Sequence, residues 1–299
     1  MIISTPASAQ SIQRSKEKIT ETLSLDEDSL QQQEQEYRRA HIQSIQKSKE
    51  ETTETLPLDE DSLQQQEQER RQAHIQRLVS QIKEPIVLGD LRQPNASITI
   101  DDGYGKESIE YMLDLFEKKW VNATFFVIGD CLKKYPDLWK RAVEHWHEIC
   151  NHTAHHDKYF KTWNEPQRFE SELVWWENVV KSVLWEDYLA RMKRDFPFFR
   201  FPWMHWIRVK AYLDILKDHG YIPIWWNYTS NPTDGRVNNG DIYLWHFNNR
   251  DTANVRKNLE LILESDKQPK TVSDIITSEG YDEPIWWHNI YKKKRESKN

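Results

Sequence analysis

The 299-residue chain is poor in glycine and cysteine and contains no long apolar run. It has 8 glycines and 2 cysteines, too few cysteines for a disulfide framework in a chain of this length. We therefore expect Cys131 and Cys150 to be free, buried thiols. No stretch of 18 apolar residues occurs, which excludes a membrane-spanning helix.

Glycine and tryptophan are absent from the first 80 residues, which contain one aromatic residue, Tyr37. All 14 tryptophans lie at or beyond Trp120. The same 80 residues hold 10 Lys and Arg against 15 Asp and Glu, and the remainder holds 31 against 33. This contrast predicts a polar extension over residues 1–80 and one folded domain over residues 81–299. A domain so close to neutral gives no electrostatic reason to expect a nucleic-acid partner.

The extension is a tandem repeat with a period of 33 residues. Ser11–Gln43 and Ser44–Gln76 agree at 27 of 33 positions. Two units are too few to bury a core, so the extension is either a helical arm that binds a partner protein or a solvated, partly disordered segment. The composition favours the second reading. Leu78, Val79 and Ile82 make its last helical stretch apolar, and we expect that end to dock on the domain.

From Ile86 onward, short apolar strands alternate with amphipathic helices, which is typical of a parallel α/β sheet. The expected strands are Ile86–Leu88, Ile98–Ile100, Thr124–Ile128, Glu148–Cys150, Phe198–Phe201, Ile222–Trp226 and Ile242–His246. The expected helices are Lys106–Lys119, Leu138–Trp146, Glu165–Leu184, Arg208–His219 and Thr252–Glu264.

Two aspartates follow one of these strands, in the segment Asp101-Asp102-Gly103. Adjacent side chains of an extended chain point to opposite sides, and glycine allows a sharp turn directly after them. One carboxylate is therefore expected to face a metal and the other a substrate pocket. The alternative is an ordinary polar turn at the end of a strand.

A histidine pair follows another expected strand. His152 and His156 are four residues apart, a spacing that places two side chains on one face of a helical turn and suits two ligands of one ion. His155 then points elsewhere and lies outside the ligand set. The alternative is a hydrated, histidine-rich loop.

Together these segments resemble the polysaccharide deacetylase family, also called the NodB-homology domain or carbohydrate esterase family 4. The family's T-F-D-D-G and H-[ST]-x-x-H motifs are similar to Thr99–Gly103 and His152–His156. Asn122–Gly129 resembles the A-T-F-F-V-x-G core strand that follows the first motif. The resemblance covers Pro85 to Leu263 and implies a distorted (β/α) barrel of NodB type, with active residues at the carboxyl ends of the strands.

The resemblance also implies a role for each matching residue. Asp102, His152 and His156 would bind a divalent metal, and zinc is the ion expected. Asp101 would be the general base, Arg200 its partner and His246 the general acid. The substrate-binding residues would be Pro202, Trp203 through its backbone N–H, Leu244 as a wall of the acetyl pocket, and Trp226.

The sequence departs from the family pattern beside the general acid. The family has an aspartate three residues after a tryptophan, where it orients the histidine, but Thr229 stands three residues after Trp226. Asp234 is the nearest carboxylate. Met204 replaces a glycine that follows the Arg200 segment in the family. These departures predict a slower or differently tuned enzyme, or a non-catalytic relative.

The resemblance thus predicts a metal-dependent hydrolase that removes acetyl groups from N-acetylated or O-acetylated carbohydrate, acting on non-peptide carbon–nitrogen bonds. Met1–Pro6 has neither the basic start nor the apolar run of a signal peptide, so a cytoplasmic location is the default, although members of the family are often secreted or act in the cell envelope. The missing export signal suggests a hydrolase of linear, non-carbohydrate amides as an alternative. The missing carboxylate suggests another, a catalytically impaired carbohydrate-binding protein.

Overall fold

The computed structural model describes residues 60–156, 165–202, 209–229, 236–247, 249–281 and 284–286. The first repeat, residues 44–59 of the second repeat and the proposed substrate residue Trp203 lie outside these residues. The chain divides between Glu67 and Gln68. Apart from the first turns of helix α3, everything described below belongs to the unit that begins at Gln68.

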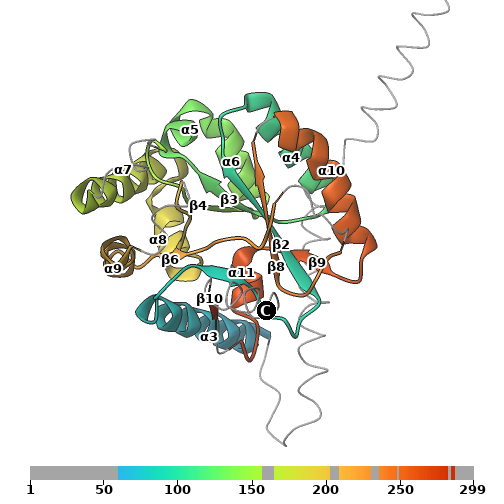
Figure 1. Cartoon of the computed structure of the whole chain (residues 1–299), viewed down its shortest axis with the longest axis horizontal. Helices are drawn as coiled ribbons and strands as arrows, with labels where there is room; N and C mark the ends of the chain where they lie inside the picture. Colours follow the sequence, from blue (N-terminus) through green and yellow to red (C-terminus); the bar gives the residue numbers. More distant parts are fainter. Residues whose placement is uncertain are drawn as a thin grey trace, which may run out of the picture. The chain divides into compact units, whose positions relative to one another are not determined.

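A parallel sheet organises this unit, as the alternation of strands and helices predicted (Figure 1). Its strands run in the order β6-β5-β4-β3-β2-β8-β7, and β9 pairs with the amino-terminal part of β2. Their bounds are β2 Asn95–Asp102, β3 Thr124–Val127, β4 Glu148–Asn151, β5 Phe198–Phe199, β6 Ile222–Pro223, β7 Tyr228–Thr229, β8 Asp241–His246 and β9 Gln268–Lys270. With its surrounding helices, the sheet forms the distorted (β/α) barrel expected from the sequence.

The strand Ile86–Leu88, β1, does not follow the alternating pattern. It pairs antiparallel with β10, Ile285–Trp286, in a separate two-stranded sheet. The backbone N–H of Trp225 donates to the carbonyl of Ile86 at 2.7 Å, so β1 also contacts the chain that leaves β6. The sequence pattern gave no sign of this pairing, because Ile285 and Ile86 are far apart along the chain.

Helices cover both faces of the sheet, which explains why strands such as β3 are buried along their whole length. In α4, buried residues recur at spacings of three and four: Ile109, Met112, Leu113 and Phe116. The helices after α3 are α4 Lys106–Lys119, α5 Gly129–Lys134, α6 Pro136–Glu144, α7 Pro166–Leu184, α8 Glu186–Asp195, α9 Lys210–Asp218, α10 Asn249–Glu264 and α11 Val272–Ile276. The sequence analysis missed α5, α8 and α11.

The core between the layers is rich in large aromatic side chains. Trp139, Trp176 and Trp245 are fully buried. Cys131 and Cys150 are buried free thiols, as expected. These buried tryptophans fill the space between the sheet and its helices, whereas Trp120, Trp146 and Trp185 are more than half exposed.

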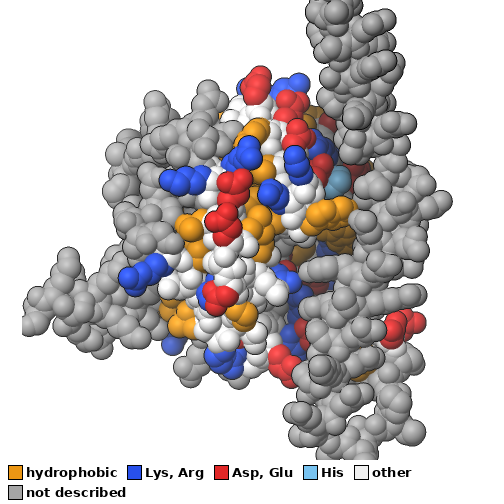
Figure 2. Space-filling model, turned by 90° about the vertical axis from the view of Figure 1, so that its right-hand side faces the viewer, with side chains coloured by type: hydrophobic (Ala, Val, Ile, Leu, Met, Phe, Trp, Pro, Cys, Tyr) orange, Lys and Arg blue, Asp and Glu red, His pale blue; other side chains and the backbone are white. Residues whose placement is uncertain are grey.

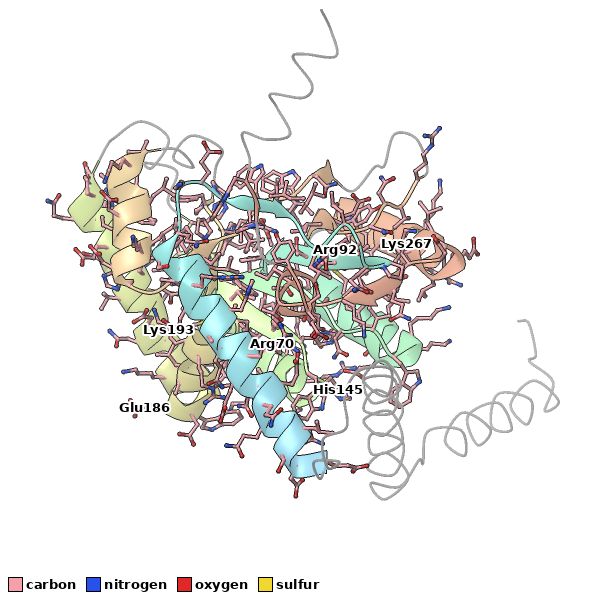
Figure 3. The ribbon with its side chains drawn as sticks, turned by 90° about the horizontal axis from the view of Figure 1, so that it is seen from below. Arg70, Arg92, His145, Glu186, Lys193 and Lys267 are labelled. Atoms are coloured by element: carbon pink, nitrogen blue, oxygen red, sulfur yellow. The ribbon has the colours of Figure 1, made fainter. Side chains whose placement is uncertain are left out.

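Helix α3, Glu60–Ser80, brings the end of the predicted extension against the domain (Figure 3). Ile75 and Leu78 are fully buried in the core. Arg70 Nη2 donates to the carbonyl of Thr277 at 2.7 Å, and Arg71 Nη2 lies 3.0 Å from Asp274 Oδ1. The docking expected for this apolar end is confirmed, whereas a domain boundary at residue 80 remains a prediction.

The described surface carries both signs of charge. On the face shown in Figure 2, Lys and Arg side chains are interspersed with Asp and Glu side chains over the described residues, and neither sign forms a continuous patch. Among the described helices, none has the length and apolar character needed to cross a membrane.

Candidate metal centre

The residues singled out from the sequence converge at the carboxyl ends of neighbouring parallel strands. Asp101 and Asp102 end β2, and His152 follows β4 directly. The register places Asp101 opposite His246 on β8. Arg200 comes directly after β5. Because these strand ends share one edge of the sheet, residues separated by up to 145 positions become neighbours.

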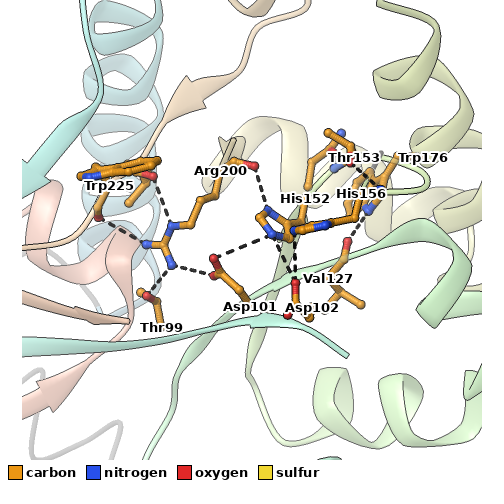
Figure 4. A network of polar contacts seen from close by, with 12 residues as sticks. Thr99, Asp101, Asp102, Val127, His152, Thr153, His156, Trp176, Arg200 and Trp225 are labelled. Atoms are coloured by element: carbon orange, nitrogen blue, oxygen red, sulfur yellow. Dashed lines mark hydrogen bonds and ion pairs between the residues drawn. The ribbon is translucent and has the colours of Figure 1, made fainter. Parts of the chain in front are cut away.

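Asp102, His152 and His156 form a compact group of candidate ligands (Figure 4). One donor atom from each lies within 4.8 Å of the other two. Asp102 Oδ1 is 3.6 Å from His152 Nε2 and 3.4 Å from His156 Nε2. The sequence-based prediction that these three side chains meet is therefore matched by their positions.

The donor set fits a divalent cation. Asp102 Oδ1 is buried and has no hydrogen-bond partner among the described residues, although it lies between two imidazole nitrogens. A buried oxygen without a partner is costly unless something else satisfies it. Two imidazoles and one carboxylate match a catalytic zinc site, which keeps a further position open. The same donors suit other first-row transition metals.

Protonation states in the cluster also favour a cation. Burial acts to raise the pKa of Asp102, but its contact with His152 and the charges of the neighbouring imidazoles outweigh burial and hold this pKa below its usual value. Burial, reinforced by the charge of His152, lowers the pKa of His156 to about 4. At neutral pH the group therefore offers an ionised carboxylate and a neutral imidazole at His156, the forms that bind metals.

The backbone conformation corrects two expectations. His152 and His156 do not share a helical turn: they belong to a tight loop in which Thr153 has φ 69° and His156 has φ 53°. Asp101 and Asp102 do not face opposite sides, because Asp102 has φ 81°, and both carboxylates lie within 3.8 Å of His152 Nε2. Left-handed backbone at residues other than glycine is strained and concentrates at functional sites.

Gly103 is required directly after the two aspartates. Its φ is 109°, a conformation that other residues rarely adopt. A Cβ atom there would lie 2.8 Å from the ring of Trp139 and 3.1 Å from the Cβ atom of Cys131. Close packing beneath the loop therefore fixes how the chain turns away from the ligand cluster.

Asp101 is held by a buried ion pair. Its Oδ1 accepts from Arg200 Nη1 at 2.7 Å, while its Oδ2 lies 3.8 Å from His152 Nε2. The Arg200 side chain is completely buried. One carboxylate oxygen is thus fixed by the arginine, and the other is directed toward the ligand cluster.

Further groups surround the Arg200 guanidinium. Its Nη1 donates to Thr99 Oγ1 at 2.6 Å, its Nε to the carbonyl of Ile224 at 3.3 Å, and its plane lies 4.0 Å from the Phe126 ring centroid. Burial lowers the pKa of Arg200, and the charge of Asp101 opposes that effect. The sequence analysis did not single out Thr99, although its position two residues before Asp101 on a strand places it on the same face.

His152 is oriented through its second ring nitrogen. Its Nδ1 lies 2.9 Å from the carbonyl oxygen of Arg200, which accepts when Nδ1 carries the proton. That tautomer leaves Nε2 as a lone-pair donor toward the cluster. Arg200 therefore positions Asp101 with its side chain and His152 with its backbone.

The proposed substrate residues lie around this edge with different exposures. Leu244 is 5% exposed and precedes His246 by two residues on β8, so both point to the same side. Pro202 is buried. Trp226 is partly buried, with its ring centroid 3.8 Å from that of Trp225. Trp203 lies outside the described residues.

Asn227, directly after Trp226, is bonded to the beginning of β8. Asn227 Nδ2 donates to Asp241 Oδ1 at 2.6 Å, and Asn227 Oδ1 accepts from the backbone N–H of Ile242 at 2.7 Å. Both partners belong to the beginning of β8, at the opposite end from His246. Asp234, Met204 and the side chain of Thr229 lie outside the described residues.

Two residues near the cluster were missed from the sequence. Tyr104 is 52% exposed, and its ring meets that of His156 edge to face at 6.5 Å. Burial and the charge of Asp102 raise the pKa of Tyr104 to about 12, so its hydroxyl keeps its proton at neutral pH. Glu172, on α7, binds His155. An exposed aromatic directly after the Asp101 motif was a usable signal, whereas nothing in the sequence connects Glu172 with the histidine loop.

Comparison with known proteins agrees with this geometry. Residues 89–224 match the sequence model of the polysaccharide deacetylase family. This region belongs to the polysaccharide deacetylase family. The matched residues include Asp101, Asp102, His152, His156 and Arg200, but they end before Trp226, Leu244 and His246.

Individual relatives match between half and two thirds of this chain. The chain is 29% identical to peptidoglycan-N-acetylmuramic acid deacetylase of Bacillus subtilis over 184 residues, which are 56% of this chain and 65% of that protein. A family 4 carbohydrate esterase from Bacillus anthracis superposes with a TM-score of 0.53 and 24% identity, covering 66% of this chain and 89% of that one. A carbohydrate esterase family 4 pseudoenzyme from the same organism gives a TM-score of 0.53 at 18% identity, with 65% and 69% covered. Both structures share the fold.

Proposed function

We propose that this chain is a metal-dependent hydrolase that removes acetyl groups from N-acetylated carbohydrate, with O-acetylated carbohydrate as a related substrate. The observation that carries the proposal is the meeting of Asp102, His152 and His156 beside a buried Asp101–Arg200 ion pair. The names of the relatives, which are deacetylases of peptidoglycan and of chitooligosaccharides, support acetylated sugar as the substrate class. In the N-acetylated substrate the bond broken is a non-peptide carbon–nitrogen bond, and in the O-acetylated substrate it is the carbon–oxygen bond of the ester.

Asp102, His152 and His156 would hold the metal, and zinc is the ion we propose. When bound, such an ion supplies Lewis acidity for the acetyl carbonyl and for an attacking water molecule. The chain contributes the neutral imidazole of His156 and the carboxylate of Asp102, whose low pKa keeps it ionised. His152 is already oriented by the carbonyl of Arg200.

Asp101 and His246 would move the protons. Asp101 Oδ2 faces the ligand cluster and accepts a proton from the attacking water, while Arg200 holds Oδ1 in place. His246, on β8, lies opposite Asp101, on the neighbouring strand β2. From there its imidazole donates a proton to the nitrogen that leaves with the sugar.

Nonpolar side chains would form the acetyl pocket. Leu244 shares a strand face with His246 and is nearly buried, so it provides a wall next to the general acid. Pro202 and Trp226 are proposed to contact the sugar, and the backbone N–H of Trp203 is proposed to donate to the oxygen on which charge develops. One such donor contributes roughly 3 kcal/mol to stabilising the transition state.

An acetate-release assay tests the proposal. Purified protein with added zinc is incubated with N-acetylglucosamine oligomers, O-acetylated xylan and small acetamides, and free acetate is measured. Release from the oligomers above that from the acetamides supports the sugar deacetylase. Release from acetamides alone indicates a hydrolase of linear amides, and no release from any of the three contradicts hydrolase activity.

A non-catalytic, carbohydrate-binding relative is the second candidate. The specific observation in its favour is that Thr229 stands three residues after Trp226, where the family has an aspartate. Binding of N-acetylglucosamine oligomers without turnover by the wild-type protein identifies this candidate. We further propose that the tandem repeat forms an extension whose end, in α3, packs on the catalytic domain.

A further inference from the structure

The loop that carries the two proposed histidine ligands, His152 and His156, is attached to α7 through His155. The backbone N–H of His155 donates to Glu172 Oε2 at 2.9 Å, and His155 Nδ1 lies 2.7 Å from Glu172 Oε1. A single carboxylate therefore binds the main chain and the side chain of one residue. Glu172 is 7% exposed, so its carboxylate is buried beneath the loop.

The opposite side of the loop is fastened to α5. The backbone N–H groups of Gly129 and Asp130 donate to the carbonyls of Thr153 and Ala154, both at 3.0 Å. Trp175 fills the space between the two helices and the loop, with its ring centroid 4.5 Å from that of His155. Hydrogen bonds thus reach every residue between the two ligands.

These attachments act on a strained segment. Thr153 and His156 both have left-handed backbone, a conformation that costs of order 1–3 kcal/mol for such residues and persists only when the surroundings enforce it. The bond from the His156 N–H to Thr153 Oγ1, at 3.1 Å, closes the loop within itself. Without an external attachment, the loop would relax and His156 Nε2 would move away from Asp102.

We propose that Glu172 is a positioning residue for the metal: by clamping His155, it holds His152 and His156 in ligand geometry before the ion binds. This inference rests on the proposed function, since it concerns the same metal site. Glu172 touches neither the ligand atoms nor the substrate. It acts through the loop, as groups behind metal ligands commonly do.

Zinc affinity of metal-depleted protein tests the clamp. In Glu172→Ala both bonds are lost, and we expect the zinc dissociation constant to rise by about 10- to 100-fold. Glu172→Gln retains an acceptor for the His155 N–H and should recover part of that loss. His155→Ala removes only the side-chain bond and should weaken zinc binding by an intermediate amount. In each case the unfolding temperature is measured alongside.

The same helix offers a matched control. Glu170 is 2.9 Å from His219 Nε2, a second Glu–His pair on α7 that does not involve the ligand loop. Glu170→Ala should leave zinc affinity unchanged within about threefold. If Glu172→Ala does not fold, His155→Ala decides the question, because that side chain is 45% exposed and its removal is tolerable.

The outcomes separate the clamp from the proposed function. Zinc binding by the wild type that is equally tight in Glu172→Ala and His155→Ala overturns the clamp and leaves the metal site intact. Zinc binding that follows the expected order, with no acetate released by the wild type, supports the clamp and contradicts the hydrolase. A wild-type protein that binds no zinc overturns both.

Discussion

The two ends of the parallel sheet bury carboxylates in different ways. At the amino ends of β3 and β4, Glu148 Oε2 accepts from Thr124 Oγ1 at 2.6 Å, and the hydroxyls of Thr271 and Ser273 on the α11 side also bond to this carboxyl. At the carboxyl ends, Asp101 faces a buried arginine, and Asp102 Oδ1 has no partner among the described residues.

The Asp102 cluster and the Glu148 cluster also differ in backbone conformation. Three of the six non-glycine residues with positive φ among the described residues, Asp102, Thr153 and His156, belong to the carboxyl-end cluster. The Glu148 cluster contains no such residue, because its partners are provided by regular strand and helix ends. The Glu148 carboxyl is satisfied by a hydroxyl, whereas the carboxyl-end cluster combines left-handed backbone at three residues with an Asp102 oxygen that has no partner among the described residues, as expected for a site that binds something else.

The largest effect is expected at Asp101. Asp101→Asn removes the proposed base, and turnover should fall by about 10²- to 10⁴-fold. Zinc content should not change, because Asp101 is not among the proposed ligands. Asp90→Asn is the control, since Asp90 is also buried and paired with an arginine, Arg92, but lies away from the cluster. Acetate release by Asp101→Asn at the wild-type rate would contradict the assignment.

The buried Arg200–Asp101 pair and the partly exposed Arg71–Asp274 pair should differ in their contribution to stability. Arg200→Met leaves Asp101 as a buried, unpaired charge and should lower the free energy of unfolding by about 3–5 kcal/mol. Arg71→Met breaks a pair whose side chains are 35% and 36% exposed, and should cost at most about 1 kcal/mol. Urea unfolding of both variants measures the difference. Equal losses would show that burial does not increase the contribution of the Arg200–Asp101 pair to the free energy of unfolding.

The amino-end cluster should make stability depend on pH. Burial raises the pKa of Glu148 from 4.5 to about 7, although the hydroxyls of Ser273 and Thr124 oppose the shift. Because the folded-state pKa is the higher one, this stabilisation is complete below about pH 4.5 and is lost as the pH rises through about 7. The slope is at most about 1.4 kcal/mol per pH unit.

Glu148→Gln keeps the shape of the side chain and removes its titration. The decrease in unfolding free energy between pH 5 and pH 8 should therefore be smaller in this variant than in the wild type. Glu170→Gln, at a half-exposed glutamate, should keep the wild-type slope. An unchanged slope in Glu148→Gln would mean that another group is responsible.

A smaller effect on stability and zinc binding is expected from a substitution at Gly129, beneath the loop that contains His152 and His156. A Cβ atom at Gly129 would lie 2.8 Å from the Trp175 ring and 3.1 Å from the Ala154 carbonyl, so Gly129→Ala should cost about 1–3 kcal/mol and weaken zinc binding. Gly220→Ala has no atom within 4 Å of the new Cβ, and it carries only the cost of left-handed backbone, about 1 kcal/mol. Wild-type zinc affinity in Gly129→Ala would contradict packing as the constraint on the loop.

Much of the fold followed from periodicity. Strands such as Glu148–Cys150 and helices such as Lys106–Lys119 were correctly located, because short apolar runs and helical spacings of buried residues are local signals. The pairing of β1 with β10 was not predictable, since two- and three-residue strands carry almost no pattern. Helix α8 was missed because its buried face has only three residues, Tyr188, Leu189 and Met192, in a highly charged segment.

The residues of the candidate site were predicted correctly from the sequence, but their backbone conformations were not. The resemblance to the polysaccharide deacetylase motifs pointed to Asp102, His152 and His156, which the fold does bring together. Ideal strand and helix geometry gave the wrong directions for these side chains, because left-handed backbone replaces both. Glu172 had no signal at all, since its contact with His155 depends on how α7 packs against the loop.

Zinc titration of the metal-depleted protein tests the central claim most directly. If Asp102, His152 and His156 hold one ion, calorimetry should show one zinc bound per wild-type chain, and His152→Ala should lose most of that affinity while remaining folded. A wild-type protein that binds no zinc, or a His152→Ala variant that binds it as tightly as the wild type, would contradict the account.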